Sequence, residues 1–322
     1  MNSTTGSALD VCVVGELNLD LILYGLPEEL VPEREHLADR LALTLGSSSA
    51  IFAHNLSVLG SRVGFISRIG DDPLGRISLE RLAAGGVDVA KVRKASGPTT
   101  TGLTVILPRT GFRHILTYPG TMFEMNFEDL DLGYLASARH FHLSSFFLHK
   151  KLQPRIPELF EKMKAAGLST SLDTNDDPDD KWEGGLRDTL RHVDVFLPNE
   201  REARKITRRN DLYAAVDELS AIVPLVVVKL GEQGALARRG EEEVSAPPVH
   251  VSFVDPVGAG DSFNAGFIHQ FVRGADLATC LAWGNLAGAF STTKPGGTEA
   301  FRDRIHFESF FAPRMDNSPM DR

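Results

Sequence analysis

The chain has 322 residues with a hydrophobic fraction of 42%, which suits one large α/β domain or two smaller ones around a sizeable core. Its formal net charge of -9 gives no basic field, so neither nucleic acid nor an anionic membrane surface is an expected partner. The first seven residues are polar and the apolar run after them is too short for a signal sequence or a membrane span, so we expect a cytoplasmic protein.

Short apolar runs alternate with helical patterns along the chain. Strands are predicted over residues 11–14, 63–66, 139–143, 169–173, 193–197 and 225–230. Helices between them include 73–84 after Asp72, 156–166, and 212–222 after Asp211, each aspartate being a good N-cap. This alternation predicts a three-layer α/β/α fold with a mostly parallel central sheet.

Two segments, 17–45 and 98–118, interrupt that alternation of strands and helices. In the second, apolar runs over 103–107 and 112–118 flank a turn with the composition of a hairpin. We interpret both segments as a small β-lid on a main domain spanning 9–312, with an exposed face that suits a homodimer. Segments 1–8 and 313–322 are expected to be flexible tails.

The most informative motif runs from Asp255 through Gly258, Ala259 and Gly260 to Asp261, after an apolar, strand-like run over 250–254 and at the start of a helix. Backbone N–H groups freed at such a helix start can bind a phosphate. Asp261 places a carboxylate in the same turn. These are the parts that phosphoryl transfer to a hydroxyl requires, because positioning and charge neutralisation supply most of its catalysis.

Other nucleotide motifs do not fit. A Rossmann fingerprint needs a third glycine where Phe263 stands, and a P-loop needs a Gly-Lys-Ser/Thr that the chain lacks. The motif therefore predicts a small-molecule kinase, with a plain helix start capped by Asp261 as the alternative.

The same motif closely resembles the C-terminal signature of the ribokinase-like, phosphofructokinase-B family of carbohydrate kinases. Further elements of that family follow in the family's order, at 15–20, 70–75, 199–202 and 230–234. The resemblance covers nearly the whole chain. It implies a ribokinase-like sandwich with a small β-sheet lid, which transfers the γ-phosphoryl group of ATP to a hydroxyl of a sugar or sugar acid.

The resemblance also implies catalytic roles. Asp261 would be the base, and the N–H groups of Gly258, Ala259 and Gly260 would form the anion hole. The helix dipole favours the ionised carboxylate, and because a loose transition state releases the hydroxyl proton late, Asp261 does not need a raised pKa to accept that proton.

For the nucleotide, the resemblance makes Asn199 a phosphate contact and Glu202 an organiser of hydrated Mg²⁺. A capping box formed by the same pair is the alternative. Lys229 could bring a charge to the phosphates or be a surface lysine, and Asn285 could contact the nucleotide or cap a kink. The predicted nucleotide-binding residues are Asn199, Lys229, Gly231, Gly234 and Asn285.

The resemblance further implies a monovalent cation beside the anion hole, for which K⁺ is the candidate. Its ligands would be the carboxylate of Asp255, the carbonyl of Val257 and carbonyls of the turn 292–297.

At the sugar end, Asp20 is expected to accept hydrogen bonds from sugar hydroxyls. Asn18 shares its strand face. The predicted substrate-binding residues are Asn18, Asp20, Gly46, Ser47, Ser48, Ile51 and Ser144. Here the chain departs from the family pattern, because Ser47 replaces a glycine and Ile51 replaces the sugar-binding asparagine, which argues against ribose. The serines are expected to cap the following helix.

Several alternatives remain open. Arg109, Arg113 and His114 of the lid either contact an acidic or phosphorylated sugar or are only solvated. A nucleoside kinase of the same fold, with Phe52 stacking on the base, and a catalytically silent sugar-binding regulator are the competing functions. His140 and His142 share a strand face, where a packed pair is favoured over a zinc site.

Overall fold

The structure, a computed structural model, describes residues 9–315; positions 1–8 and 316–322 of the predicted tails lie outside the described residues. A nine-stranded sheet has the order β13-β12-β11-β10-β9-β8-β1-β4-β5. Neighbours from β11 to β5 pair in parallel, whereas β12 and β13 form an antiparallel edge. The strands are β1 (Leu9–Val14), β4 (Val63–Ile69), β5 (Asp88–Lys94), β8 (Ala138–Leu143), β9 (Ser169–Leu172), β10 (Val195–Phe196), β11 (Leu225–Lys229), β12 (Ala235–Arg239) and β13 (Glu242–Ala246).

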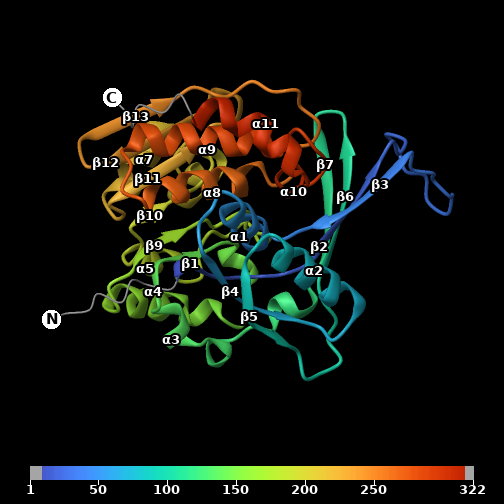
Figure 1. Ribbon diagram of the computed structural model, residues 1–322, viewed down its shortest axis with the longest axis horizontal. Coiled ribbons are helices and arrows are strands. Elements are labelled where there is room, and N and C mark those ends of the chain that lie inside the picture. The colour runs from blue at the N-terminus through green and yellow to red at the C-terminus, as the bar shows by residue number, and fades with distance from the viewer. Residues whose placement is uncertain (1–8, 316–322) are drawn as a thin grey trace.

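Helices cover both faces of this sheet (Figure 1). In β1, Val11 and Val13 pack into one apolar core while Cys12 and Val14 pack into the other, as expected for a strand buried on both sides. The three-layer α/β/α prediction is therefore confirmed. The helices are α1 (Ser48–Val58), α2 (Pro73–Ala84), α3 (Leu132–Leu135), α4 (Ile156–Ala165), α5 (Leu186–Leu190), α6 (Glu200–Thr207), α7 (Leu212–Ser220), α8 (Ala259–Phe271), α9 (Leu277–Ser291), α10 (Glu299–Arg302) and α11 (Arg304–Met315).

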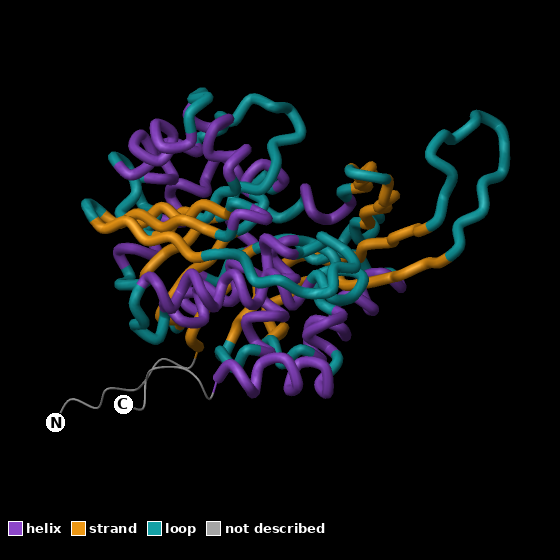
Figure 2. The backbone as a smooth tube through the Cα atoms, turned by 90° about the horizontal axis from the view of Figure 1, so that it is seen from above, coloured by secondary structure: helices purple, strands orange, loops and turns teal. Residues whose placement is uncertain are grey.

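A second, four-stranded sheet of order β3-β2-β6-β7 projects from the main body (Figures 1 and 2). Its strands are β2 (Leu19–Tyr24), β3 (Arg40–Leu45), β6 (Leu103–Arg109) and β7 (Phe112–Tyr118). The predicted hairpin of β6 and β7 is present, with Arg109 opposite Phe112 next to the turn. Apolar side chains of β7 are exposed on the outer edge, among them Phe112, Leu116 and Tyr118.

The strand-like run over 250–254 is not a strand, so this prediction was wrong. The N–H of Val254 donates to the carbonyl of Thr292 at 2.8 Å, outside either sheet. Phe253 is 65% exposed. The apolar character of this run comes from lining a cavity beside α8 and not from burial in the sheet.

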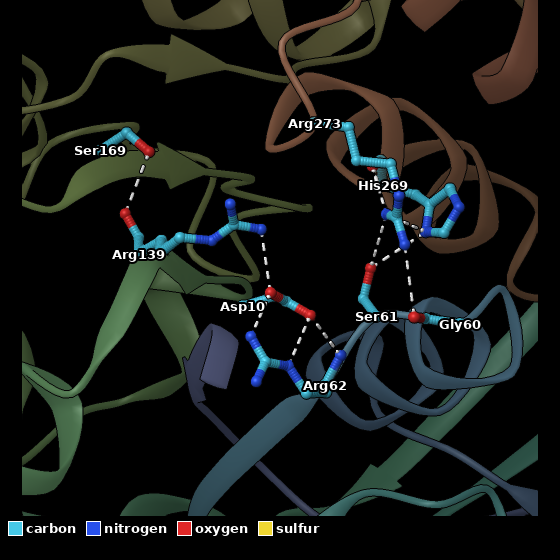
Figure 3. Close-up of polar contacts among 8 residues, drawn as sticks. All are labelled: Asp10, Gly60, Ser61, Arg62, Arg139, Ser169, His269 and Arg273. Atoms are coloured by element: carbon cyan, nitrogen blue, oxygen red, sulfur yellow. Dashed lines mark hydrogen bonds and ion pairs between the residues drawn. The ribbon is translucent and has the colours of Figure 1, made fainter. Parts of the chain in front are cut away.

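Charge fixes the amino edge of the main sheet (Figure 3). Asp10 of β1 accepts hydrogen bonds from Arg62, which precedes β4, at 2.8 to 3.2 Å, and from Arg139 of β8 at 2.9 Å. The bonds from Arg62 lower the pKa of Asp10 to about 2. Three neighbouring strands therefore begin at one ion-pair network, and the opposite, carboxyl edge carries the candidate site.

Within residues 9–315, no helix is both long and apolar enough to span a bilayer.

Candidate active site

Polar side chains gather at the carboxyl edge of the main sheet. Glu16 follows β1, Asp173 follows β9, Asn199 follows β10, and Lys229 ends β11. Asn199 and Lys229 also form a backbone bridge. Ligands of open α/β sheets bind at this edge, so it is here that the predicted site residues can meet.

The glycine motif opens α8 in the geometry of an anion hole. Gly258 has φ 74°, and a Cβ added to it would lie 2.5 Å from Cα of Gly297, so only glycine fits. The N–H of Ala259 makes a long hydrogen bond of 3.3 Å to the carbonyl of Pro256. Within the described residues, the N–H groups of Gly258 and Gly260 have no acceptor. The helix start therefore offers free donors to an anion.

Asp261 lies in the first turn of α8 and is 8% exposed. Burial, together with the negative charge of Asp173, raises its pKa to about 7, although Lys229 and a hydrogen bond from Ser48 oppose the rise. Desolvation therefore opposes the effect of the helix dipole, which favours the ionised carboxylate.

A cavity of about 630 Å³ opens beside the anion hole. The predicted residues Lys229, Gly231, Gly234 and Asn285 all line it, together with Ala259 and Gly260. Asn285 does not cap a kink: its amide donates to the carbonyls of Ala246 at 3.1 Å and Pro247 at 2.8 Å. This residue therefore holds the cavity wall in place.

Asn199 and Glu202 form the capping box of α6. Oδ1 of Asn199 accepts from the N–H of Glu202 at 2.9 Å, and Glu202 accepts from the N–H of Asn199 at 2.8 Å. Burial and the charge of Asp173 raise the pKa of Glu202 to about 7. Capping thus accounts for both side chains, yet Glu202 stays within electrostatic reach of the carboxyl edge.

Asp255 already accepts several hydrogen bonds. Its carboxylate receives the N–H of Val257 at 2.9 Å, the N–H of Gly296 at 3.2 Å and the hydroxyl of Tyr24. Tyr24 belongs to β2, so this last bond joins the small sheet to the loop that carries the anion hole. A cation at Asp255 would have to share the carboxylate with Tyr24.

Asp20 faces the site from the small sheet. It is 6% exposed, and burial followed by the charge of Asp261 raises its pKa to about 7, while Arg113 opposes the rise. A Cβ on Gly46 would come within 2.2 Å of Oδ1 of Asp20. Gly46 therefore makes room for Asp20, which lies within electrostatic reach of Asp261.

The serines before α1 link separate parts of the site. Ser47 has φ 66°, and its hydroxyl exchanges hydrogen bonds with Asn18. Ser48 donates to Asp261, and Ser49 donates to Glu16 at 2.8 Å. The prediction of helix capping was wrong for Ser47, the N-cap residue, whose side chain makes no cap bond because Asn18 engages it.

A family model for pfkB family carbohydrate kinases matches residues 8–304. The chain belongs to this family. An uncharacterized sugar kinase of Archaeoglobus fulgidus is 31% identical over 249 residues, which cover 76% of this chain and 96% of the relative. The protein is accordingly a ribokinase-like carbohydrate kinase.

Two further similarities bear on the substrate and the fold. A 2-dehydro-3-deoxygluconokinase of Bacillus subtilis is 25% identical over 313 residues, 92% of this chain and 96% of the relative. The structure of Arabidopsis thaliana ribokinase complexed with ribose and ATP superposes with a TM-score of 0.78 at 23% identity, covering 94% of this chain and 98% of that one.

Some residues of the kinase lie away from the pocket where the sequence placed them. Ile51 is 3% exposed and packs against the backbone of Gly258 and Gly297. Ser144 is fully buried, with its hydroxyl 2.8 Å from Nε2 of His142. Both side chains are buried and contact other protein groups next to the site.

Phe52 is fully buried and stacks on the ring of His142 at 3.8 Å, so it is not free to stack on a nucleoside base. The nitrogens of His140 and His142 contact serine hydroxyls at 2.7 to 2.8 Å, as favoured for a packed pair. Across residues 9–315 no group of three His, Cys, Asp or Glu side chains could hold a metal ion.

Sequence reasoning assigned no definite role to several residues that shape the site. Asn264 of α8 and Asp173 both contact Lys229. Asn55 donates to Ser262 and to the carbonyl of Gly297, each at 2.9 Å. Asn55 lies one helical turn after Ile51, so helical periodicity was the available signal. The contacts of Asn264 and Asp173 with Lys229 join distant segments, so no local pattern indicated these pairings.

Proposed function

We propose that this carbohydrate kinase transfers the γ-phosphoryl group of ATP to a hydroxyl of a sugar or sugar acid, with Asp261 as the base. One observation carries the proposal: the free N–H groups of Gly258 and Gly260 and the carboxylate of Asp261 occupy a single helical turn. That turn lies beside the 630 Å³ cavity on one side and within reach of Asp20 on the other.

In this proposal the acceptor oxygen bonds to the γ-phosphorus as the bond from phosphorus to the β-phosphate oxygen breaks. The acceptor's proton passes to Asp261, whose pKa near 7 suits a general base at neutral pH. The N–H groups of Gly258, Ala259 and Gly260 and the ammonium of Lys229 stabilise the phosphoryl oxygens.

We assign Mg²⁺ to Glu202, through water. The fit rests on charge: Glu202 and Asp261 are buried carboxylates that each lie within electrostatic reach of the buried carboxylate of Asp173, and Lys229 is the ammonium that interacts with all three. The surplus of negative charge suits a divalent cation that keeps several waters and needs few protein ligands. When bound, Mg²⁺ neutralises charge on the ATP phosphates, and Asn199 contributes a phosphate contact.

K⁺ is assigned to Asp255 and the carbonyl of Val257, in competition with the hydroxyl of Tyr24. Exchanging K⁺ for a bulky organic cation should lower activity. Unchanged activity would leave Tyr24, and no cation, as the partner of Asp255.

For the acceptor, we propose that Asp20 receives sugar hydroxyls, supported by Asn18, Gly46, Ser47 and Ser48. Two observations favour a sugar acid over ribose. Arg113 of the small sheet lies within electrostatic reach of Asp20, and Ile51 cannot supply an amide hydrogen bond. The similarity to the Bacillus subtilis sugar-acid kinase points the same way.

The small sheet would act as a lid that excludes water, a competing acceptor. We propose the main kinase domain over 9–312, the lid over 17–45 and 98–118, and a homodimer through the exposed apolar edge of β7. We further propose that the protein works in the cytoplasm, where ATP is supplied.

The test is ADP release in the presence of a panel of sugars, sugar acids and nucleosides. Asp261→Asn should retain acceptor binding and lose at least about 100-fold in kcat, as expected for loss of a general base. Asp10→Asn, which removes a buried carboxylate at the opposite edge of the sheet, is the matched control. If no acceptor stimulates ADP release while some bind, the protein is a sugar-binding regulator.

A further inference from the structure

The ammonium of Lys229 forms a closed triangle of polar contacts with the side chains of Asp173 and Asn264. Nζ lies 2.6 Å from Oδ2 of Asp173 and 3.3 Å from Oδ1 of Asn264. The amide nitrogen of Asn264 donates to the same Oδ2 of Asp173. Each member therefore contacts the other two, and each comes from a different element, namely the end of β9, the end of β11 and α8.

Asp173 is itself held in place. Its other oxygen, Oδ1, accepts the N–H of Asn175 at 3.1 Å, and the side chain is fully buried. A carboxylate whose two oxygens are both engaged has one orientation. Asp173 can therefore impose that orientation on a flexible lysine.

The ammonium sits next to the anion hole. A Cβ added to Gly260 would lie 3.7 Å from Nζ of Lys229, and both residues line the 630 Å³ cavity. Asp173 and Asn264 accept two of the three N–H bonds of the ammonium. Across residues 9–315 the third has no acceptor, which leaves it for a ligand in the cavity.

We propose that Asp173, with Asn264, is a positioning residue that aims the Lys229 ammonium at the phosphoryl group held by the N-terminus of α8. This inference rests on the proposed function, because it takes the phosphoryl group to bind there. Neither residue needs to touch the substrate. Their effect is to fix the direction of the free N–H bond and to keep the lysine charged.

Charge supports the geometry. Burial disfavours the ammonium of Lys229, yet Asp173 and Glu202 outweigh burial and raise its pKa. The same Asp173 raises the pKa of Asp261. Replacing Asp173 by its neutral isostere should therefore move both limits of the pH profile downward: Asp261 ionises at lower pH, and Lys229 loses its proton at lower pH.

The experiment compares Asp173→Asn with Asp10→Asn, which neutralises another buried carboxylate, paired with Arg62 and Arg139 (Figure 3) at the opposite edge of the sheet. Asp173→Asn should lower kcat on the order of 10- to 100-fold, the size expected for a misplaced catalytic group, and leave KM for the sugar unchanged. The alkaline limb of the pH profile should move to lower pH. Asn264→Ala, which keeps the carboxylate, should lower kcat less.

A double-mutant cycle with Lys229→Met separates positioning from a structural role. If Asp173 acts through Lys229, Asp173→Asn has little further effect on kcat in the Lys229→Met background. Additive losses, unmoved pH limits or a kcat within about twofold of the Asp10→Asn control would overturn the proposal.

A binding measurement distinguishes failure of this inference from failure of the proposed function. Calorimetric titration with a non-hydrolysable ATP analogue needs no acceptor, and Asp173→Asn should weaken that binding about 10-fold. Weakened binding with no active acceptor would count against the proposed reaction and for the positioning role. Unchanged binding and unchanged kcat in an active kinase would reject the positioning role alone.

Discussion

Asp20 of the small sheet and Asp261 of α8 lie close enough that the charge of Asp261 raises the pKa of Asp20. Both are buried, and the pKa of each is raised to about 7. Two segments separated by most of the chain thus place like charges near one another. An acceptor hydroxyl bound by Asp20 would be presented directly to the proposed base.

The first prediction concerns pH. A general base acts only when deprotonated, and the pKa of Asp261 is raised to about 7 by burial and by Asp173. We therefore expect kcat/KM to fall tenfold per pH unit below about pH 7. Initial rates from pH 5 to 9, with circular dichroism to establish that the fold persists, provide the measurement. A rate that stays constant down to pH 5 would contradict the role of Asp261.

The second prediction concerns stability. A carboxyl group whose pKa is higher in the folded than in the unfolded chain stabilises the fold fully below the unfolded pKa, and this contribution declines as pH rises through about 7. Ionised Asp261 therefore costs stability at pH 8. Asp261→Asn should raise the unfolding temperature by a few degrees at pH 8, and the gain should shrink towards pH 4.

Asp10→Asn provides the opposite case. Hydrogen bonds from Arg62 lower the pKa of Asp10 to about 2, so its contribution is present above the unfolded pKa and is lost as pH falls through about 2. This variant should lower the unfolding temperature at pH 8. Calorimetry of both variants between about pH 2 and pH 8 checks the pair. A loss of stability in Asp261→Asn at pH 8 would show that its hydrogen bond from Ser48 outweighs the relief of desolvation.

The fold was predictable because its signals are local. Apolar runs bounded by helical patterns predicted β1 and β11 within two residues, and Asp72 marked the start of α2 as an N-cap. The edge strands β5 and β13 were missed, since their charged sequences lack the apolar run that marks a central strand. The run over 250–254 misled because an apolar cavity lining has the composition of a strand.

The site was predictable only in part. Asp261 and its glycines form one continuous motif, so their proximity followed from the sequence. The links from Ser48 to Asp261 and from Tyr24 to Asp255 join segments more than 200 residues apart, as does the contact of Asn55 with Ser262. Such pairings depend on how α1 packs against α8 and how the small sheet packs against the loop before α8, which no local pattern encodes.

The third prediction tests the wall of the nucleotide cavity. The amide of Asn285 donates to the carbonyls of Ala246 and Pro247, and Asn285→Ala would leave both without that donor. We expect KM for ATP to rise about 10-fold, equivalent to the loss of one or two hydrogen bonds, with kcat within about twofold of the wild type. Steady-state kinetics at saturating sugar measures both. A fall in kcat with unchanged KM for ATP would place Asn285 in the chemical step instead.

The last prediction separates the anion hole from ordinary backbone strain by comparing two glycines. Gly258 has φ 74° and Gly274 has φ 80°, so alanine at either position costs about 1 kcal/mol in backbone strain. Only at Gly258 does the new Cβ collide, 2.5 Å from Cα of Gly297, whereas at Gly274 it meets no atom within 4 Å. Gly258→Ala should lower kcat about 100- to 1,000-fold by displacing the N–H donors, and Gly274→Ala, which has the strain without the collision, should retain wild-type kcat with a smaller loss of stability. Equal kcat values for the two variants would mean that the donors at the start of α8 do not stabilise the transferring phosphoryl group.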